Sequence, residues 1–363
     1  MSDNKSVNRV SKARLIWAIA VKDFVDGFKN RKLLTNTITV IFLVLLYRFL
    51  PTLGGGSDPT RLVLYDEGAS SIVRELERSE EVRLRVAETY EDMVYKVGVE
   101  DMHTLGIVLP ADFDQQVTTS DGLALEAIVD HWVSDEDEAY MREDVEPELT
   151  RLAGVPVQVN MVREEITQAD GAFAFQIALG LLLVMGMMGM MFTPELVTQE
   201  KVSRTLDALQ VSPATMTEML IAKGFVGGTY SMLMGVFVLI AYGQFVLHWW
   251  AILLAMVAGA FFNVSIGLLL GVLLKEPKQV GLWGFIIFQP FIISMIVGMF
   301  EAVSPSIRYA MRWFPTVSMG NAAAQSITAS VDLGSYSLSL LVMITWGIAF
   351  YILAAWFLRR MEA

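Results

Sequence analysis

The chain alternates between long apolar blocks and long polar blocks, and the apolar blocks are long enough to cross a membrane. A transmembrane helix needs about 20 mostly apolar residues. Blocks of this kind occupy residues 33–53, 172–193, 224–246, 251–274, 280–303 and 337–358. We therefore predict a polytopic α-helical membrane protein with six transmembrane helices.

Residues 54–171, between the first two apolar blocks, have the pattern of a soluble domain. Strand-like runs occupy residues 61–67, 82–88, 104–110 and 124–130, and helical spacing occurs at 70–82 and 90–102. This order of strands and helices predicts an inserted α/β domain with a mixed sheet and helices packed on it. The acidic remainder, residues 134–170, is predicted to be helical as the chain returns to the membrane.

A basic segment, residues 1–32, precedes the first apolar block. Trp17, Val21, Phe24 and Phe28 recur at helical spacing, opposite Lys22, Asp23, Asp26 and Lys29. We predict an amphipathic interface helix that lies on the inner face of the membrane; the alternative is a soluble, partner-binding helix. The basic cluster places the N-terminus inside, and six spans return the C-terminus to the same side.

A polar segment, residues 195–216, separates the second and third apolar blocks. Its apolar side consists of Leu206, Leu209 and Val211, and its polar side of Gln199, Glu200, Lys201, Arg204 and Asp207. The pattern predicts a helix that ends at Ser212-Pro213, because proline cannot continue a helix. Thr215 is predicted to cap the next helix, with Glu218 completing a capping box. The segment is either an ordinary loop or a docking helix that receives force from a soluble partner.

Composition agrees with a membrane protein and shows that charge is segregated along the chain. The 363 residues are 54% hydrophobic, with a mean hydropathy of +0.49. Residues 54–170 hold 9 basic and 28 acidic residues, a formal charge of −19, whereas the remainder of the chain is +7. We therefore expect the acidic segment and the basic remainder of the chain to face two different compartments. The absence of cysteine excludes disulfides, thiol catalysis and cysteine metal sites.

The sequence offers little that could carry out catalysis or bind a metal. The three histidines are scattered, and the DEDE run at 135–138 lacks the spacing of a calcium loop, so we interpret it as a solvated loop. The methionine cluster MGMMGMM (185–191) favours flexible packing over a soft-metal site, with Gly186 and Gly189 allowing close helix contact. No phosphate-binding glycine loop occurs, and acidic residues within the spans are scarce. We expect no catalytic, cofactor or metal residues, and an external source of energy.

A few polar and small residues lie within or beside the predicted spans. Gln176, Asn263, Gln289 and Pro290 are candidates for a translocation path. Gly267 and Gly271 form a small-residue motif that is more often used within a chain than between chains. Arg308 and Arg312 fall on the outer side of the six-span topology, against the usual positive-inside trend.

Two stretches of the chain resemble the ABC-2 type exporter permeases. QEKVSRTLDALQVSPAT (199–215) is similar to the family's coupling-helix signature, except that Arg204 stands where the family usually has glycine. LVLYDEGASSIVREL, GIVLPADFDQQV and LALEAIVD, all within residues 62–130, are similar to the extracytoplasmic domain of one subgroup. WFPTVSMGNAA (313–323) resembles the family's turn in an outer re-entrant or interfacial segment, placed here at 304–336. With the spans, the resemblance covers nearly the whole chain.

The resemblance implies the permease subunit of an ATP-binding-cassette exporter in the plasma or inner membrane. A separate cytoplasmic ATPase would bind ATP and Mg, and a second permease copy, identical or related, would complete the transporter within the lipid bilayer. The residues implied in coupling to the ATPase are Gln199, Glu200, Lys201, Arg204, Thr205, Leu206, Leu209, Ser212 and Pro213. No nucleic acid partner is expected, and the substrate stays open among drugs, sodium, lipids and peptides.

Two other classes of function stay open at this point. One is a membrane-anchored sensor or assembly protein, whose outer domain binds a partner while the spans only anchor it. The other is a membrane-embedded enzyme that acts on a lipid or a peptide. Internal glycines and the Gln289-Pro290 pair argue against simple anchoring, and no cluster of catalytic polar residues at one depth supports the enzyme.

Overall fold

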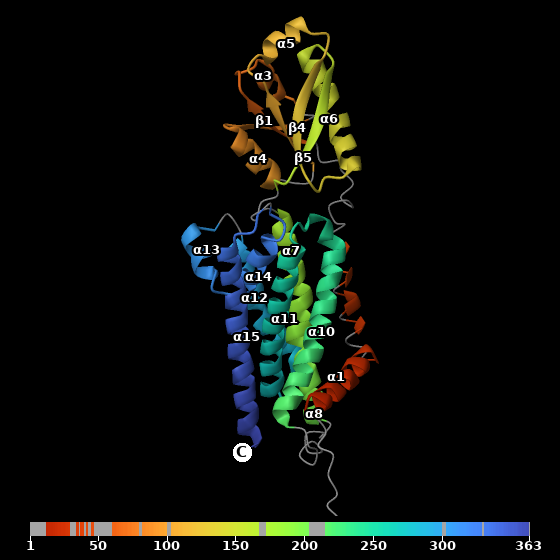
Figure 1. Cartoon of the computed structure of the whole chain (residues 1–363), viewed down its shortest axis with the longest axis vertical. Helices are drawn as coiled ribbons and strands as arrows, with labels where there is room; N and C mark the ends of the chain where they lie inside the picture. The colour runs from red at the N-terminus through yellow and green to blue at the C-terminus, as the bar shows by residue number, and fades with distance from the viewer. Residues whose placement is uncertain are drawn as a thin grey trace, which may run out of the picture.

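A computed structural model shows an α/β domain stacked on one end of a bundle of long helices, with the C-terminus at the opposite end (Figure 1). The structure describes residues 12–29, 60–79, 82–99, 103–166, 172–202, 215–299, 303–328 and 330–362, and short helical pieces between 34 and 46. All structural statements below concern these residues.

The α/β domain is built on a five-stranded mixed sheet with the order β2-β1-β3-β4-β5. Its strands are β1 (Arg61–Asp66), β2 (Arg83–Ala87), β3 (Thr104–Leu109), β4 (Leu123–Asp130) and β5 (Val157–Glu164). Strand β1 is parallel to both β2 and β3, β3 and β4 are antiparallel, and β4 and β5 are parallel. The mixed sheet expected from the alternation of apolar and polar residues is therefore confirmed.

Helices cover both faces of this sheet. They are α3 (Ile72–Leu76), α4 (Tyr90–Val99), α5 (Phe113–Thr119) and α6 (Asp135–Ala153). Leu62 and Leu64 of β1 share one buried cluster with Met141 and Val145 of α6, whereas Val63 shares another with Met93 of α4. Successive residues of a strand point to opposite faces, so the continuous apolar run of β1 supplies both cores.

Two expectations for this domain need correction. Residues 134–170 are helical only in α6; the chain then forms strand β5, whose alternating Val157 and Val159 are buried. The DEDE run is the first turn of α6 and not a loop: the Ser134 hydroxyl caps the helix by accepting from the Asp137 amide at 3.1 Å, and carboxylates at this end favour the helix dipole.

Five helices of the described residues are long and apolar enough to cross a membrane. They are the continuous helix α7 (Ala172–Met187), η1 (Met188–Phe192) and α8 (Thr193–Val202), then α10 (Met216–Tyr242), α11 (Trp249–Leu273), α12 (Pro277–Met299) and α15 (Leu333–Glu362). The first predicted span, residues 33–53, lies largely outside the described residues. Residues 195–202, predicted to start a separate coupling helix, instead prolong the helix of the preceding span.

The bundle packs through small residues that let helix backbones touch. A Cβ added to Gly267 of α11 would collide with the carbonyl oxygen of Gly189 in η1, and one added to Gly271 would lie 2.8 Å from Val197 Cβ. Likewise, a Cβ on Gly186 would lie 2.6 Å from the Phe288 ring. The interpretation of these glycines as sites of close helix contact within the chain is confirmed.

Two short helices connect α12 to α15. Helix α13 (Pro305–Met311) has no buried residue, whereas α14 (Pro315–Ala324) is almost entirely buried and contacts α7, α11, α12 and α15. Each begins with a proline, which suits the first turn of a helix because its missing amide hydrogen would have no partner there. The segment between α12 and α15 thus has one helix on the surface and one inside the bundle.

The α/β domain contacts the bundle through an aromatic pair. The Trp132 ring meets the Phe245 ring edge-on at 5.3 Å, and Phe245, in η2 (Gly243–Phe245) after α10, is fully buried. The backbone amides of Leu247 and His248 both donate to the Ser326 carbonyl at 2.9 Å, which ties the α10–α11 connection to the segment after α14. This end of the bundle is therefore the one that carries the domain.

Candidate functional site

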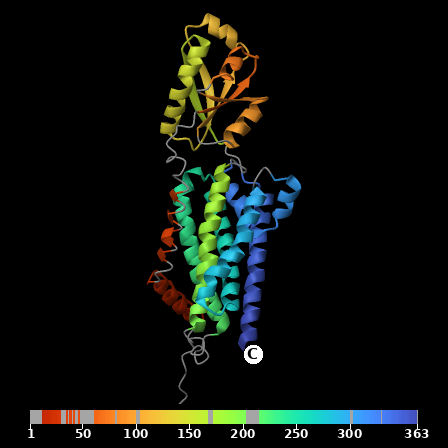
Figure 2. The ribbon, with the colours of Figure 1, turned by 180° about the vertical axis from the view of Figure 1, so that it is seen from behind.

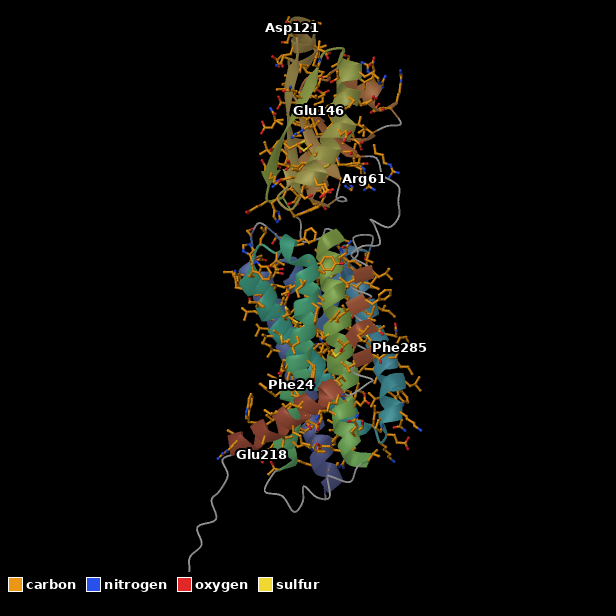
Figure 3. All side chains as sticks on the ribbon, turned by 90° about the vertical axis from the view of Figure 1, so that its right-hand side faces the viewer. Phe24, Arg61, Asp121, Glu146, Glu218 and Phe285 are labelled. Atoms are coloured by element: carbon orange, nitrogen blue, oxygen red, sulfur yellow. The ribbon has the colours of Figure 1, made fainter. Side chains whose placement is uncertain are left out.

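The elements that the sequence associates with coupling meet at the end of the bundle opposite the α/β domain. Helix α1 (Lys12–Lys29) lies across the lower part of α10, close to the end of α8, and α15 runs on the other side of the bundle (Figure 2). Figure 3 shows Phe24 of α1 and Glu218 of α10 in this region, far from Arg61, Asp121 and Glu146 of the domain. The predicted interface helix and the two arms that flank residues 203–214 are thus neighbours.

A buried ion-pair cluster joins these three helices. The Lys223 ammonium of α10 lies 2.8 Å from the Asp23 carboxylate of α1 and 2.8 Å from the Glu200 carboxylate of α8. The Lys223 side chain is only 1% exposed, and the two carboxylate side chains are 11% and 19% exposed. We call these three residues the Lys223 triad. A single ammonium therefore holds together segments that are 200 residues apart in the chain.

Local sequence explains how α10 presents Lys223 to the interior. Thr215 caps the helix: its hydroxyl accepts from the Glu218 amide at 3.3 Å, and the Glu218 carboxylate accepts from the Thr215 amide at 2.9 Å. The predicted capping box is therefore confirmed, and the helix that it starts at Met216 continues into the predicted span that begins at 224. From this start, Leu220, Lys223 and Tyr230 fall on the same buried side of α10.

Helix α1 has two functional faces, and only one was expected. Trp17 and Val21 of the predicted apolar stripe are exposed, Trp17 by 59%, as suits contact with a lipid surface. Asp23, assigned from the sequence to the solvated side, is instead buried against Lys223. The assignment of Asp23 to the polar face is therefore wrong, because the bundle supplies it with a cation.

Tyr230 of α10 fixes the other edge of α1. Its hydroxyl donates to the Phe24 carbonyl at 2.7 Å, and the two rings lie 5.0 Å apart. A Cβ on Gly27 would lie 2.5 Å from the Tyr230 hydroxyl oxygen, so a larger residue at this crossing would have to displace the Tyr230 ring. Near the start of α1, the Trp17 ring meets the Phe225 ring at 5.8 Å. Helix α1 is thus anchored to α10 over more than two turns.

The two residues beside Glu200, Gln199 and Lys201, make different contacts. The Lys201 ammonium donates to the carbonyls of Val272 and Leu274, the latter at 3.0 Å, at the C-terminal end of α11. A cation at this position favours the helix dipole and satisfies carbonyls that lack partners within the helix. Gln199 is exposed and bonds only within its own helix, to Glu195 at 3.2 Å. Lys201 therefore ties α8 to α11, and Gln199 faces outward.

Several residues implied in coupling fall where the structure gives no description. Arg204, Thr205, Leu206, Leu209, Ser212 and Pro213 lie in 203–214, outside the described residues. The same holds for the side chain of Phe28 in α1. Their roles stay predictions.

The four residues proposed for a translocation path come from three helices. Gln176 is half-buried on α7, and Asn263 on α11 is fully buried, with neither atom of its amide hydrogen-bonded to a described residue. On α12, Gln289 is half-buried and Pro290 is exposed, and the helix continues through Pro290. The cavity discussed below, beside α13, is lined by other residues, and the role of these four in a path stays a prediction.

The electrostatics of the Lys223 triad decide what it can do. At 2.8 Å and an effective dielectric constant of about 20, each Lys223–carboxylate attraction amounts to about 6 kcal/mol before the cost of desolvation. The cost of desolvation cancels most of this attraction, so such a cluster stabilises a fold little compared with well-packed apolar residues. Removing one member is different, because an uncompensated buried charge costs about 3–5 kcal/mol. The triad therefore acts as a tie that resists separation of α1, α8 and α10.

The sequence interpretation missed Lys223 and Tyr230, although a signal was present. Lys223 lies one residue before the predicted span, where a basic residue normally faces the headgroups. The spacing Leu220–Lys223–Gly227–Tyr230, however, places the lysine among the core-facing residues of a helix. A cation on a core face needs an anionic partner, which would have drawn attention to Asp23 and Glu200.

Comparison with known protein families identifies the chain. A search of curated proteins gives no match. The sequence does match the family described as ABC-2 family transporter protein over residues 31–356, which includes both the α/β domain and the helix bundle. This match agrees with the five span-length helices. The chain is therefore a multi-pass membrane protein that belongs to the ABC-2 transporter family.

Proposed function

We propose that this chain is the membrane-spanning subunit of an exporter, and that the Lys223 triad couples it to a separate ATPase. The triad carries the proposal. Helix α8 ends two residues after Glu200 and α10 begins seven residues before Lys223, so the Glu200–Lys223 ion pair joins the two helices that flank residues 203–214, the segment that resembles the coupling signature. Asp23 adds the interface helix to the same tie. A displacement of this segment by a partner would therefore reach α1, α8 and α10 together.

Charge distribution supports an orientation with both termini in the cytoplasm of a cell that carries this protein in its plasma or inner membrane. At the end of the bundle remote from the domain lie Lys275 after α11, Lys278 in the first turn of α12, and Arg359 and Arg360 at the end of α15. Basic residues prefer the cytoplasmic side of a membrane. The acidic α/β domain is then extracytoplasmic.

The partners follow from what this chain lacks and from its family. The sequence has no phosphate-binding glycine loop, and permeases of this family typically leave ATP hydrolysis to another chain. We propose a cytoplasmic ATPase subunit that holds ATP and Mg, and a second permease copy in the same bilayer. Substrate would move outward near α7, α11 and α12, the helices of Gln176, Asn263, Gln289 and Pro290.

Photo-crosslinking tests this proposal. A crosslinking amino acid at Gln199, which is exposed beside the triad, is expected to capture a protein with a phosphate-binding loop, identified by mass spectrometry. The matched control is Trp250, also exposed, at the opposite end of the bundle. The coupling proposal would be overturned if the crosslinker at Trp250 captured the same ATPase. It would also be overturned if neither position captured an ATPase.

A further inference from the structure

A cavity of about 320 Å³, lined by both polar and apolar residues, opens at the end of the bundle that carries the α/β domain, beside the exposed helix α13. Its walls come from the end of α12, from α13 and α14, and from the start of α15, and include Gly298, Tyr309, Asn321 and Gln325. Two cations, Arg308 and Arg312, also line it. These are the two arginines whose place in the sequence ran against the positive-inside trend.

Neither arginine forms an ion pair with a carboxylate of the described residues. Arg308 Nε is buried and has no hydrogen-bond partner there. The Arg312 guanidinium donates to the Ser335 hydroxyl at 2.9 Å and lies 6.0 Å from the centre of the Tyr309 ring. The nearby Asp332 carboxylate accepts from the backbone amides of Gly334 and Ser335, at the start of α15. Among the described residues, no carboxylate therefore neutralises the two arginines of the cavity, and the Arg308 Nε–H group is available to an anion.

The cavity also holds an acceptor without a donor. Gln325 Oε1 is buried and has no hydrogen-bond partner among the described residues. A buried carbonyl oxygen without a partner is costly, so a ligand that brings a hydroxyl or N–H group would satisfy it. The complementary ligand thus carries both an anionic oxygen cluster and a hydrogen-bond donor.

The position of the cavity indicates where this ligand comes from. Gly298 and Ser335 lie near the ends of α12 and α15, two of the span-length helices, so the cavity lies at the edge of the apolar belt. Around it, Tyr309 and Trp313 are 66% and 59% exposed, and Ile307 is exposed as well. Aromatic residues in such positions mark the level of lipid headgroups. A volume of about 320 Å³ accommodates a headgroup but not acyl chains.

We propose that this cavity binds the phosphate-bearing, hydroxylated headgroup of an anionic phospholipid. Arg308 and Arg312 would hold the phosphate oxygens, since the guanidinium fork matches that geometry. Gln325 would accept from a headgroup hydroxyl, and the acyl chains would lie along exposed apolar residues of α12 such as Ile293 and Ile296. This proposal concerns lipid binding and stands whether or not the chain is an exporter.

The test uses the full chain in nanodiscs of phosphatidylcholine with a minor fraction of phosphatidylglycerol, and native mass spectrometry to count retained phosphatidylglycerol. The double variant Arg308→Gln/Arg312→Gln is expected to lower its affinity by about 10-fold for each arginine lost, the usual worth of a charge-assisted contact. The matched control is Arg359→Gln/Arg360→Gln, with the same change of charge at the other end of the bundle, and it is expected to retain the lipid. Equal loss in both variants, or no loss in either, would overturn the proposal.

Two further arms make the result specific. Soluble glycerol phosphate is expected not to compete with the lipid at millimolar concentration; full competition would show a site for a free anion and refute the lipid. If the double variant fails to fold, Gln325→Glu places a negative charge in the cavity without removing either arginine. It is expected to expel the anionic lipid but not phosphatidylcholine, and unchanged retention would refute the site.

Discussion

Replacing Lys223 by methionine should separate the contribution of the triad to stability from the coupling that we propose for it. Methionine keeps a long apolar side chain in the buried stripe of α10 but removes the ammonium that lies 2.8 Å from both Asp23 and Glu200. Two carboxylates are then left in a buried site without a cation. The expected loss in free energy of unfolding is about 3–5 kcal/mol, a large fraction of the 5–15 kcal/mol typical of folded domains.

A compensated variant shows which task matters. In Asp23→Asn/Glu200→Gln/Lys223→Met no member carries a charge, and replacing a buried ion-pair cluster by neutral residues is often neutral or stabilising. We expect the thermal midpoint of unfolding to return close to that of the wild-type chain. Transport-dependent ATPase activity of the reconstituted complex should stay low, because α1, α8 and α10 are no longer tied by charge.

The control for this series is Lys29→Met, which removes a lysine of α1 that pairs with Asp26 at 3.8 Å on the exposed side. Exposed pairs contribute at most about 1 kcal/mol, so both stability and ATPase activity should hardly change. The reasoning fails if Lys223→Met behaves like Lys29→Met. It also fails if the compensated variant recovers full activity, because the triad would then serve stability alone.

Two further predictions concern packing and pH. Gly267→Ala should force α11 away from Gly189 and lower the thermal midpoint of unfolding, at a cost of about 1–3 kcal/mol. The control is Gly281→Ala, because a Cβ at Gly281 would meet nothing within 4 Å. Equal midpoints for the two variants would contradict the contact between Gly267 and Gly189. In the α/β domain, the hydrogen bond from Lys96 lowers the pKa of the Asp92 carboxyl. A lowered pKa in the folded state adds stability that is present above about pH 4 and lost on further acidification. In Asp92→Asn the difference in stability between pH 6 and pH 3 should therefore shrink, measured by chemical unfolding of the domain; an unchanged difference would contradict this.

Local rules predicted much of this fold because they act within a few residues. The apolar run of β1 and the Thr215–Glu218 capping box depend on neighbours in the sequence, and both appear where expected. Strand β5 was missed because its assignment depends on pairing with β4, a contact that no local pattern reveals. The acidic composition around it suggested a helix, and tertiary pairing overrode that preference.

The site was harder to predict because it is made of long-range contacts. Glu200 was identified because the stretch that contains it resembles a coupling signature, but its partner Lys223, one residue before a predicted span, was given no role. Asp23 looked like one polar residue among several on an amphipathic helix. Only the three-dimensional crossing of α1 over α10 shows that its burial is compensated.

Asn263 offers a test of whether the interior of the bundle is built for stability or for passage. Asn263 is fully buried against η1, because a Cβ added to Gly189 of η1 would lie 2.5 Å from the Asn263 Cβ. Neither the nitrogen nor the oxygen of the Asn263 side-chain amide has a hydrogen-bond partner among the described residues. Single π-helical turns such as η1 occur frequently at functional sites.

If the amide is held without partners, Asn263→Leu removes a cost of about 1–3 kcal/mol, and the thermal midpoint should rise. Transport should fall in the same variant, because a polar group that is kept at such a cost is explained by contact with substrate or water during passage. A variant that is less stable would show that the amide is already satisfied at rest. If the variant is more stable and equally active, Asn263 is not part of the translocation path, and the polar residues of the path would have to come from α7 and α12.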